Sequence, residues 1–130
     1  MKICVIPIDN RPVCYNLFKD ISAIDESLEL FIPDRALLGD LTRNADIGGI
    51  LKWLKNTPKI DAMVISLDTV AYGGLISSSR STETFLKIKN NIENFKKILK
   101  TKNSKNYPFL NIIRISNNKI NQEEKEYWDK

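Results

Sequence analysis

The sequence predicts an α/β fold built on an open parallel sheet. Two apolar runs, at residues 3–8 and 62–67, have the length of buried strands. Between and after them, apolar residues recur at helical spacing, so strands and helices alternate with short connections. This alternation is typical of βαβ units with right-handed crossovers. We therefore expect a Rossmann-like or flavodoxin-like parallel sheet of about four strands in the order 2-1-3-4.

Prolines mark the ends of the first elements. Pro12, after the strand at residues 3–8, suits the first position of a helix. The strand at residues 28–32 is closed by Pro33, and a second helix stops before Pro58 because proline disfavours helical backbone in the preceding residue. The apolar positions of the two helices are Val13, Leu17, Ile21, Ile24, Ile47, Ile50, Leu51 and Leu54, with Asn44 or Asp46 as the expected cap of the second.

The second half of the chain is expected to add a loop, a long helix and a fourth strand. The loop runs from the strand at residues 62–67 to Arg80. Ser81 or Thr82 is the expected cap of the long helix, and Glu83 in its first turn complements the helix dipole. The apolar stripe of this helix is Phe85, Ile88, Ile92, Phe95 and Leu99; residues 103–108 end it, residues 109–115 form the fourth strand, and residues 122–128 begin another helical pattern.

The predicted sheet has an unfinished side. Sheets of this class usually continue to five or more strands, and here the fourth strand and the last helix would have an exposed partner face. Residues 1–130 are therefore expected to form one α/β domain that is the N-terminal fragment of a longer protein. The missing C-terminal portion, or a second copy of the chain, would cover the exposed sheet edge.

Composition excludes several classes of protein and of site. The chain has 42% hydrophobic residues, enough for a core, and its N-terminal apolar stretch is too short for a signal peptide or a membrane span. A cytoplasmic protein with no membrane partner is expected. Cys4 and Cys14 form no CxxC pair and are expected to be reduced, mostly buried thiols. The absence of histidine excludes a Ser-His-Asp triad, a Cys-His pair and an imidazole metal ligand within this chain.

Positive charge gathers in the C-terminal part of the chain. Residues 1–80 contain nine basic and ten acidic side chains, whereas residues 81–130 contain eleven and six. Cations in the last turns of a helix complement its dipole, and no aromatic platform lies between these lysines. A solvated helix face is therefore expected, with no nucleic-acid partner. The lysines concerned are Lys96, Lys97, Lys100, Lys102 and Lys105.

Two aspartates, Asp9 and Asp68, end the apolar runs. Parallel strands end at one edge of the sheet, where ligands bind, so we expect the two carboxylates about 5 to 10 Å apart. Carboxylates placed in this way can act as a catalytic acid and base, or can hold a divalent cation such as Mg²⁺. Alternatively, each aspartate caps a neighbouring helix or turn.

Further candidates for binding a small-molecule substrate lie in the segments that follow these strands. Paired glycines let backbone amides approach a ligand or adopt a positive φ, and arginine offers a planar fork to carboxylate or phosphate. The arginines can equally pair with the two aspartates and neutralise them. The segment matches neither a Walker loop nor the dinucleotide pattern GxGxxG. The candidates are Asn10, Arg11, Tyr72, Gly73, Gly74, Ser79, Arg80 and, in the expected fourth strand, Arg114.

Several segments in combination resemble a known family. They are Pro7–Val13, Ile32–Pro33 with Leu37–Gly39, Val64–Asp68 and Ala71–Arg80, with Ile113–Arg114 and Glu124–Trp128 as later matches. The combination resembles the N-terminal part of the bacterial domain-of-unknown-function family 4127, over essentially the whole chain. The resemblance implies relatives several times longer than this chain. It implies no activity.

Together, these residues predict the N-terminal α/β part of an enzyme, such as a hydrolase, that acts on a small polar or anionic substrate like a sugar derivative. Asp9 and Asp68 would act as acid, base or metal ligands. A receiver-like or other ligand-binding module is an alternative, because Asp68 follows the third strand as a phosphoacceptor does, although Arg11 and Pro12 replace the usual acidic pair. An inactive truncated fragment is a third hypothesis.

Overall fold

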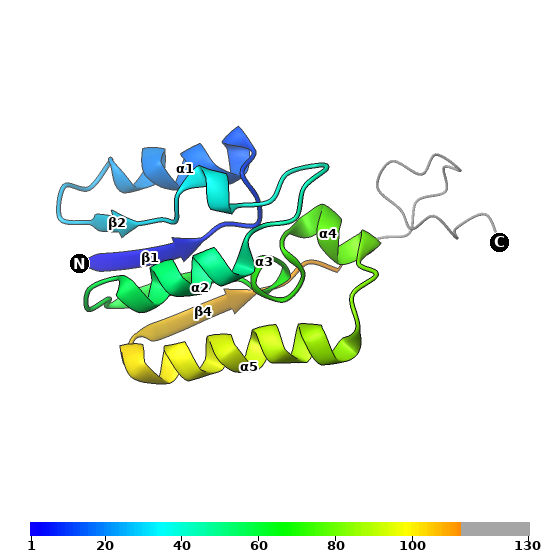
Figure 1. Ribbon diagram of the computed structural model, residues 1–130. Helices are drawn as coiled ribbons and strands as arrows, with labels where there is room; N and C mark the ends of the chain where they lie inside the picture. Colours follow the sequence, from blue (N-terminus) through cyan, green and yellow to red (C-terminus); the bar gives the residue numbers. More distant parts are fainter. Residues whose placement is uncertain (113–130) are drawn as a thin grey trace.

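The chain folds around a parallel sheet whose strand order confirms the predicted class. A computed structural model describes residues 1–112 and contains four parallel strands in the order β2-β1-β3-β4 (Figure 1). The strands are β1 (Lys2–Ile6), β2 (Glu29–Phe31), β3 (Ala62–Ser66) and β4 (Lys105–Phe109). β1 and β3 form the centre of the sheet, and β2 and β4 form its edges.

Helices cover the two faces of this sheet unequally. They are α1 (Pro12–Ser22), η1 (Arg35–Leu37), α2 (Ile47–Asn56), α3 (Leu67–Tyr72), α4 (Leu75–Arg80) and α5 (Phe85–Lys102). Because β2 and β3 flank β1 on opposite sides, right-handed crossovers place α1 on one face and α2 on the other. On that second face α2 packs against α5, and Figure 1 shows both helices in front of the sheet. None of these helices has both the length and the apolar character needed to cross a membrane.

The core lies mainly between the sheet and the helix pair α2 and α5. Alternate residues of a strand point to the same face, and on this face the residues of β1 and β3 are fully buried. They contact the inward residues of both helices. The core residues on this side are Cys4, Ile6, Met63, Ile65, Ile50, Leu54 and Phe95.

The segment between β3 and Arg80 is helical, so the predicted loop is wrong. The Ser66 side chain caps α3 by accepting a hydrogen bond from the N–H of Thr69 at 3.3 Å. Gly73 ends α3 with a φ of 91°, and Gly74, with a φ of 134°, leads into α4. Each helix has six residues, which is too short for the apolar periodicity that reveals helices in a sequence.

The fourth strand lies earlier than predicted. β4 begins at Lys105 and includes Pro108, so the predicted strand at residues 109–115 starts too late. Lys105 N–H donates to the carbonyl of Asp61 on the β3 side, at 3.0 Å, and the alternation along the strand turns the nitrogen of Pro108 towards the open edge. An edge strand needs no donor there, so proline is tolerated. The expected helical pattern at residues 122–128 lies outside the described residues.

On the second face, one of the two predicted caps of α2 is correct, and both predicted caps of α5 are wrong. Asp46, one of the two expected caps of α2, accepts a hydrogen bond from the N–H of Gly49 at 2.9 Å. α5 is capped by Thr84 and not by Ser81 or Thr82, so it begins later than predicted. The acidic residue expected in its first turn therefore precedes the helix.

The apolar stripe predicted for α1 faces solvent. Within residues 1–112, its members Val13, Leu17, Ile21 and Ile24 are 68%, 49%, 54% and 84% exposed. The helix instead buries Tyr15, whose hydroxyl donates to the carbonyl of Pro33 at 3.0 Å. Phe85, the first residue of the stripe expected in α5, is also exposed. Helical periodicity shows which residues share a face, but the burial of that face depends on what lies opposite.

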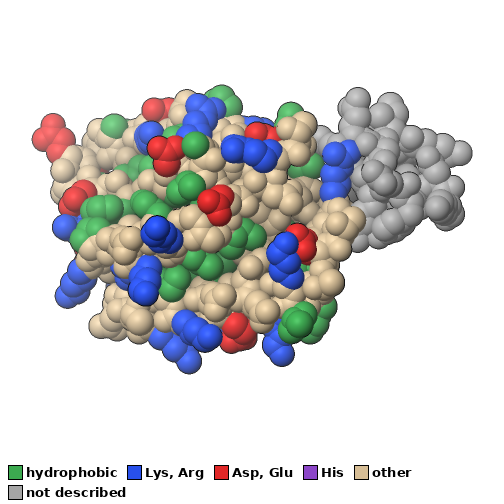
Figure 2. Space-filling view, in the orientation of Figure 1, with side chains coloured by type: hydrophobic (Ala, Val, Ile, Leu, Met, Phe, Trp, Pro, Cys, Tyr) green, Lys and Arg blue, Asp and Glu red, His purple; other side chains and the backbone are tan. Residues whose placement is uncertain are grey.

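The lysines of α5 lie on a solvated face. Lys96 is within ion-pair distance of Glu93, and Lys102 donates to the carbonyls of Lys55 and Thr57 at the end of α2. Figure 2 shows Lys and Arg side chains spread over this side of the molecule, with acidic side chains between them. A charge arranged in this way is typical of an ordinary helix surface.

Candidate functional site

Loops that follow the strands are joined to one another at the carboxyl edge of the sheet. The segment after β1 binds the loop after β2, where Asn10 N–H donates to the carbonyl of Gly39 at 2.9 Å. The loop after β2 in turn binds the end of α3, where Ala45 N–H donates to the carbonyl of Gly73 at 2.9 Å. The residues after β4 join the same edge through Asn111. Ligands of open α/β sheets bind at this edge.

Asp9 is buried and paired with Arg11. The carboxylate is 3% exposed and its Oδ2 accepts from Arg11 Nε at 2.8 Å and lies 2.6 Å from Arg11 Nη2. Its Oδ1 accepts from the Arg11 backbone N–H at 3.1 Å. The Arg11 side chain is 37% exposed. The pair therefore carries no net charge. For Arg11, this is the alternative in which an arginine neutralises an aspartate.

Asp68 is buried with a different kind of partner. It lies in the first turn of α3, not at the end of a strand, and is 5% exposed. Its Oδ2 accepts hydrogen bonds from the backbone N–H and the side-chain amide of Asn111, at 3.0 and 2.9 Å. Both donors are neutral, so they hold the carboxylate in place and neither of them neutralises it.

Thr69 brings the two aspartates to the same part of the edge. Its hydroxyl, which is fully buried, donates to the carbonyls of Pro7 and Ile8 at 2.7 and 2.9 Å. Thr69 follows Asp68 and Ile8 precedes Asp9, so each aspartate is the direct neighbour of a residue in this contact. The segments after β1 and β3 are therefore in direct contact beside both aspartates.

The two glycines after α3 have their amides engaged within the chain. Gly73 N–H donates to the carbonyl of Thr69 at 3.0 Å, and Gly74 N–H donates to the carbonyl of Asp68 at 3.2 Å. A Cβ at Gly74 would lie 3.3 Å from the Ile8 carbonyl oxygen, and both positions have positive φ. The glycines thus permit a close approach between the β1 and β3 segments, and they shape the site through the backbone.

The remaining predicted substrate-binding residues lie around this centre. Tyr72 is the last residue of α3 and is half-buried. Ser79, in α4, donates to the carbonyl of Ile76 at 2.9 Å, and Arg80 ends that helix. Arg114 lies outside the described residues.

The two aspartates as placed do not fit a magnesium site. Mg²⁺ requires octahedral oxygen ligands. Both oxygens of Asp9 accept hydrogen bonds from Arg11, whose positive charge would repel a cation. Within residues 1–112, no group of three or more carboxylate or thiol side chains gathers.

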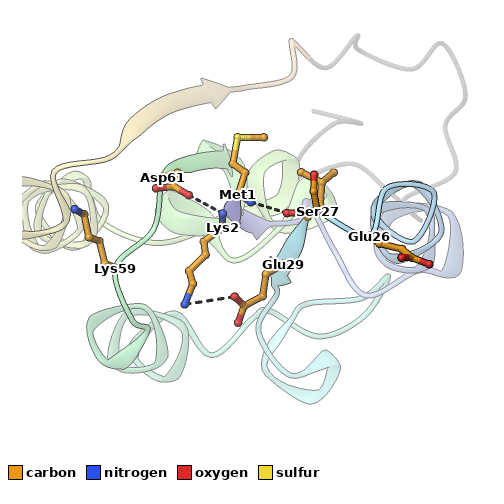
Figure 3. Close-up of a pocket in the computed structure, with 8 residues that line it drawn as sticks. Met1, Lys2, Glu26, Ser27, Glu29, Lys59 and Asp61 are labelled. Carbon is orange, nitrogen blue, oxygen red and sulfur yellow. Dashed lines mark hydrogen bonds and ion pairs between the residues drawn. The ribbon is translucent and has the colours of Figure 1, made fainter.

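A hollow of about 600 Å³ lies at the opposite, amino edge of the sheet (Figure 3). Its polar groups bind one another: the Met1 amine donates to the Ser27 carbonyl, the Lys2 backbone N–H donates to Asp61, and the Lys2 ammonium pairs with Glu29. These contacts join the amino ends of β1, β2 and β3 to one another. The hollow is lined by Met1, Lys2, Glu26, Ser27, Leu28, Glu29, Lys59 and Asp61.

Comparison with known proteins decides the family. The family model described as a protein of unknown function, DUF4127, matches residues 3–130. The chain belongs to the DUF4127 family. This confirms the resemblance noted in the sequence, and the match includes every segment of the carboxyl edge described above. Neither the curated proteins nor the solved structures contain a match to the chain.

Three residues of this DUF4127 site were not predicted from the sequence. Thr69 and Asn111 bind groups distant in the chain, and such pairings leave no local pattern. Arg35 lies in η1, where its Nε donates to the carbonyl of Asn10 at 2.8 Å and its guanidinium lies 5.7 Å from the ring centre of Tyr15. Its position shortly after the second strand is a signal that could have identified it.

Proposed function

We propose that this DUF4127 chain forms the N-terminal α/β part of an enzyme that binds a small polar or anionic substrate at the carboxyl edge. The observation that supports this most strongly is the environment of Asp68, which is 5% exposed and, among the described residues, accepts only from Asn111. Among residues 1–112, no Lys or Arg lies within ion-pair distance of it. Burying a carboxylate without a cation costs free energy, and such arrangements concentrate at functional sites.

The two aspartates are proposed to have different roles. Asp9 is oriented and neutralised by Arg11, so it is suited to shape the site and to orient a substrate hydroxyl. Asp68 pairs with no cation among residues 1–112, so it is suited to bind substrate hydroxyls or to act as the general base. Two carboxylates in unlike surroundings are a frequent source of an acid and base pair.

The state of Arg35 favours a substrate that carries an anionic group. Its side chain is exposed, it is fixed by the Asn10 carbonyl, and within residues 1–112 it pairs with no carboxylate. A guanidinium in this state offers its remaining N–H groups to a carboxylate or phosphate. A sugar acid or sugar phosphate combines the hydroxyls that suit Asp68 with the anion that suits Arg35. Hydrolysis of such a derivative is the reaction we propose.

Isothermal titration of the 130-residue chain with glucose, glucuronate and glucose 6-phosphate tests this proposal. We expect binding of at least one anionic probe, weakened about tenfold or more by Asp68→Asn, because a hydrogen bond to a charged group contributes about 1.5–3 kcal/mol. Arg35→Gln is expected to weaken only the anionic probes. Asp20→Asn, which changes an exposed carboxylate on α1, is the matched control and should bind as the wild type does. Absence of binding to all three probes, or equal affinity in Asp68→Asn, would contradict the proposal.

A further inference from the structure

Two cationic side chains lie over one aromatic ring, that of Tyr15 in α1. Lys19 Nζ lies 4.5 Å and Arg35 Cζ lies 5.7 Å from the ring centre, so the two charged groups are separated by no more than the sum of these distances. Lys19 follows Tyr15 by one turn on the same face of α1, whereas Arg35 reaches the ring from η1. The fold therefore brings two positive charges from different elements to one place.

The ring beneath these charges is fixed in the structure. Tyr15 is buried, belongs to the core, and donates its hydroxyl hydrogen to the carbonyl of Pro33 at 3.0 Å. Lys19 and Arg35 are exposed, so both charged groups are open to solvent. Attraction to the face of a ring positions a cation and does not neutralise it. Both charges are therefore held in place and remain available to a ligand.

Neither cation is paired with an acidic side chain. Within residues 1–112, no ion pair joins Lys19 or Arg35 to a carboxylate. Asp34, which precedes Arg35, instead accepts from the N–H of Ala36 at 2.8 Å. Arg35 Nε donates to the carbonyl of Asn10 at 2.8 Å, and among the described residues its two terminal nitrogens bind no other group. The outer N–H groups of the guanidinium fork are therefore directed to a ligand.

The same hydrogen bond places the two cations at the carboxyl edge. Asn10 directly follows Asp9, and its N–H donates to the loop after β2 at Gly39. Arg35 is thus fixed to the backbone of the segment that carries one of the two buried aspartates. A group bound by Arg35 and Lys19 would lie on the β2 side of the proposed substrate site.

We infer that Lys19 and Arg35 form a subsite for a phosphate group, so that the substrate of the carboxyl edge is a phosphate monoester. Such a group carries about 1.5–2 negative charges near neutral pH, which two cations match, whereas a carboxylate carries one. The fork of Arg35 suits two phosphate oxygens, and the Lys19 ammonium acts as a point charge. The place of the phosphate within a substrate rests on the proposed function. The affinity for phosphate itself does not.

Isothermal titration of the 130-residue chain with inorganic phosphate, at constant ionic strength, tests the subsite directly. We expect saturable binding that Lys19→Gln weakens about three- to tenfold, because an exposed cation contributes moderately to the binding of an anion. Within residues 1–112, the Lys19 side chain donates no hydrogen bond, so this variant removes a charge and leaves the hydrogen bonds of the fold intact. Lys97→Gln, which removes an exposed charge from α5, is the matched control and should bind phosphate as the wild type does.

NMR spectroscopy of the wild-type chain locates the bound phosphate without a variant. The Arg35 Nε–H and the Tyr15 ring signals should shift on addition of phosphate and saturate at the calorimetric Kd. Arg35→Lys keeps the charge but loses the planar fork, so its affinity for phosphate should lie between those of the wild type and Arg35→Gln. Absence of phosphate binding, or shifts that spare both Tyr15 and Arg35, would overturn the inference. Equal weakening by Lys19→Gln and Lys97→Gln would also overturn it, because binding would then depend on overall charge.

Glucose 6-phosphate separates this inference from the proposed function. If both hold, Lys19→Gln and Asp68→Asn each weaken its binding, whereas inorganic phosphate is weakened by Lys19→Gln alone. If Asp68→Asn weakens glucose 6-phosphate but Lys19→Gln leaves phosphate binding unchanged, the inference fails and the proposed function stands. If phosphate binding needs Lys19 but Asp68→Asn leaves glucose 6-phosphate unaffected, the proposed function fails and the subsite stands. Tighter binding of glucuronate than of glucose 6-phosphate would refute the assignment of the subsite to phosphate.

Discussion

The hydroxyl of Thr69 should be the main polar link between the β1 and β3 segments, and Thr69→Val tests this at nearly constant side-chain volume. The hydroxyl is fully buried and donates to the carbonyls of Pro7 and Ile8 at 2.7 and 2.9 Å. Valine keeps the branched shape but removes the donor from the buried Pro7 carbonyl and the half-buried Ile8 carbonyl. A buried polar group left without a partner costs about 1–3 kcal/mol. We expect a loss of about 2 kcal/mol in the free energy of unfolding.

Urea denaturation followed by circular dichroism measures this loss. With a slope of about 1–2 kcal/mol per molar urea, the midpoint should fall by about 1–2 M while the slope stays constant. Thr101→Val is the matched control: the Thr101 hydroxyl also donates to a carbonyl, that of Ile98 at 2.7 Å, but on the exposed surface of α5. Water replaces that lost bond, so we expect a change within about 0.5 kcal/mol. Equal effects in the two variants would refute the argument that burial makes the Thr69 contact costly.

Two further predictions concern the loop after β2. Gly39→Ala should destabilise the chain by about 3 kcal/mol in urea denaturation, because its Cβ would lie 2.3 Å from the Gly73 carbonyl oxygen. Gly48→Ala, whose Cβ would lie no closer than 3.5 Å to Asp46, should be neutral or stabilising by about 0.5 kcal/mol; similar losses in both variants would argue against the close approach. The pKa of Asp40 is lowered by hydrogen bonds from the loop that follows it, so this turn should be intact above the ordinary carboxyl pKa and should loosen as pH falls through the lowered value. A carboxyl midpoint at or above the ordinary value in an NMR titration would contradict this.

The strand order could be predicted because it depends on features that are local in the chain. Apolar runs, helical spacing and prolines identify the alternating elements, and the right-handed crossover then leaves few arrangements. The errors lie where local patterns are weak. α3 and α4 have only six residues each, and Pro108 predicts a break because the sequence does not show that β4 is an edge strand.

The candidate site, like the fold, could be predicted only where its features are local in the chain. The sequence located Asp9, Asp68, Arg11 and the paired glycines at one edge, because residues that directly follow parallel strands must meet there. It left open whether each arginine would bind a ligand or an aspartate. Asn111 was missed since it binds Asp68 across 43 positions of the chain.

The sequence by itself determined the family, the parallel order of the strands and the edge at which its polar residues gather, since all three depend on patterns among near neighbours in the chain. Only the tertiary structure decided which groups are paired. Asp9 is neutralised by Arg11, whereas Asp68, within residues 1–112, receives only the neutral backbone and side-chain N–H groups of Asn111. Burial raises the free-energy cost of an unpaired charge, so the partners that folding supplies, and not the residue types alone, determine what each carboxylate can do.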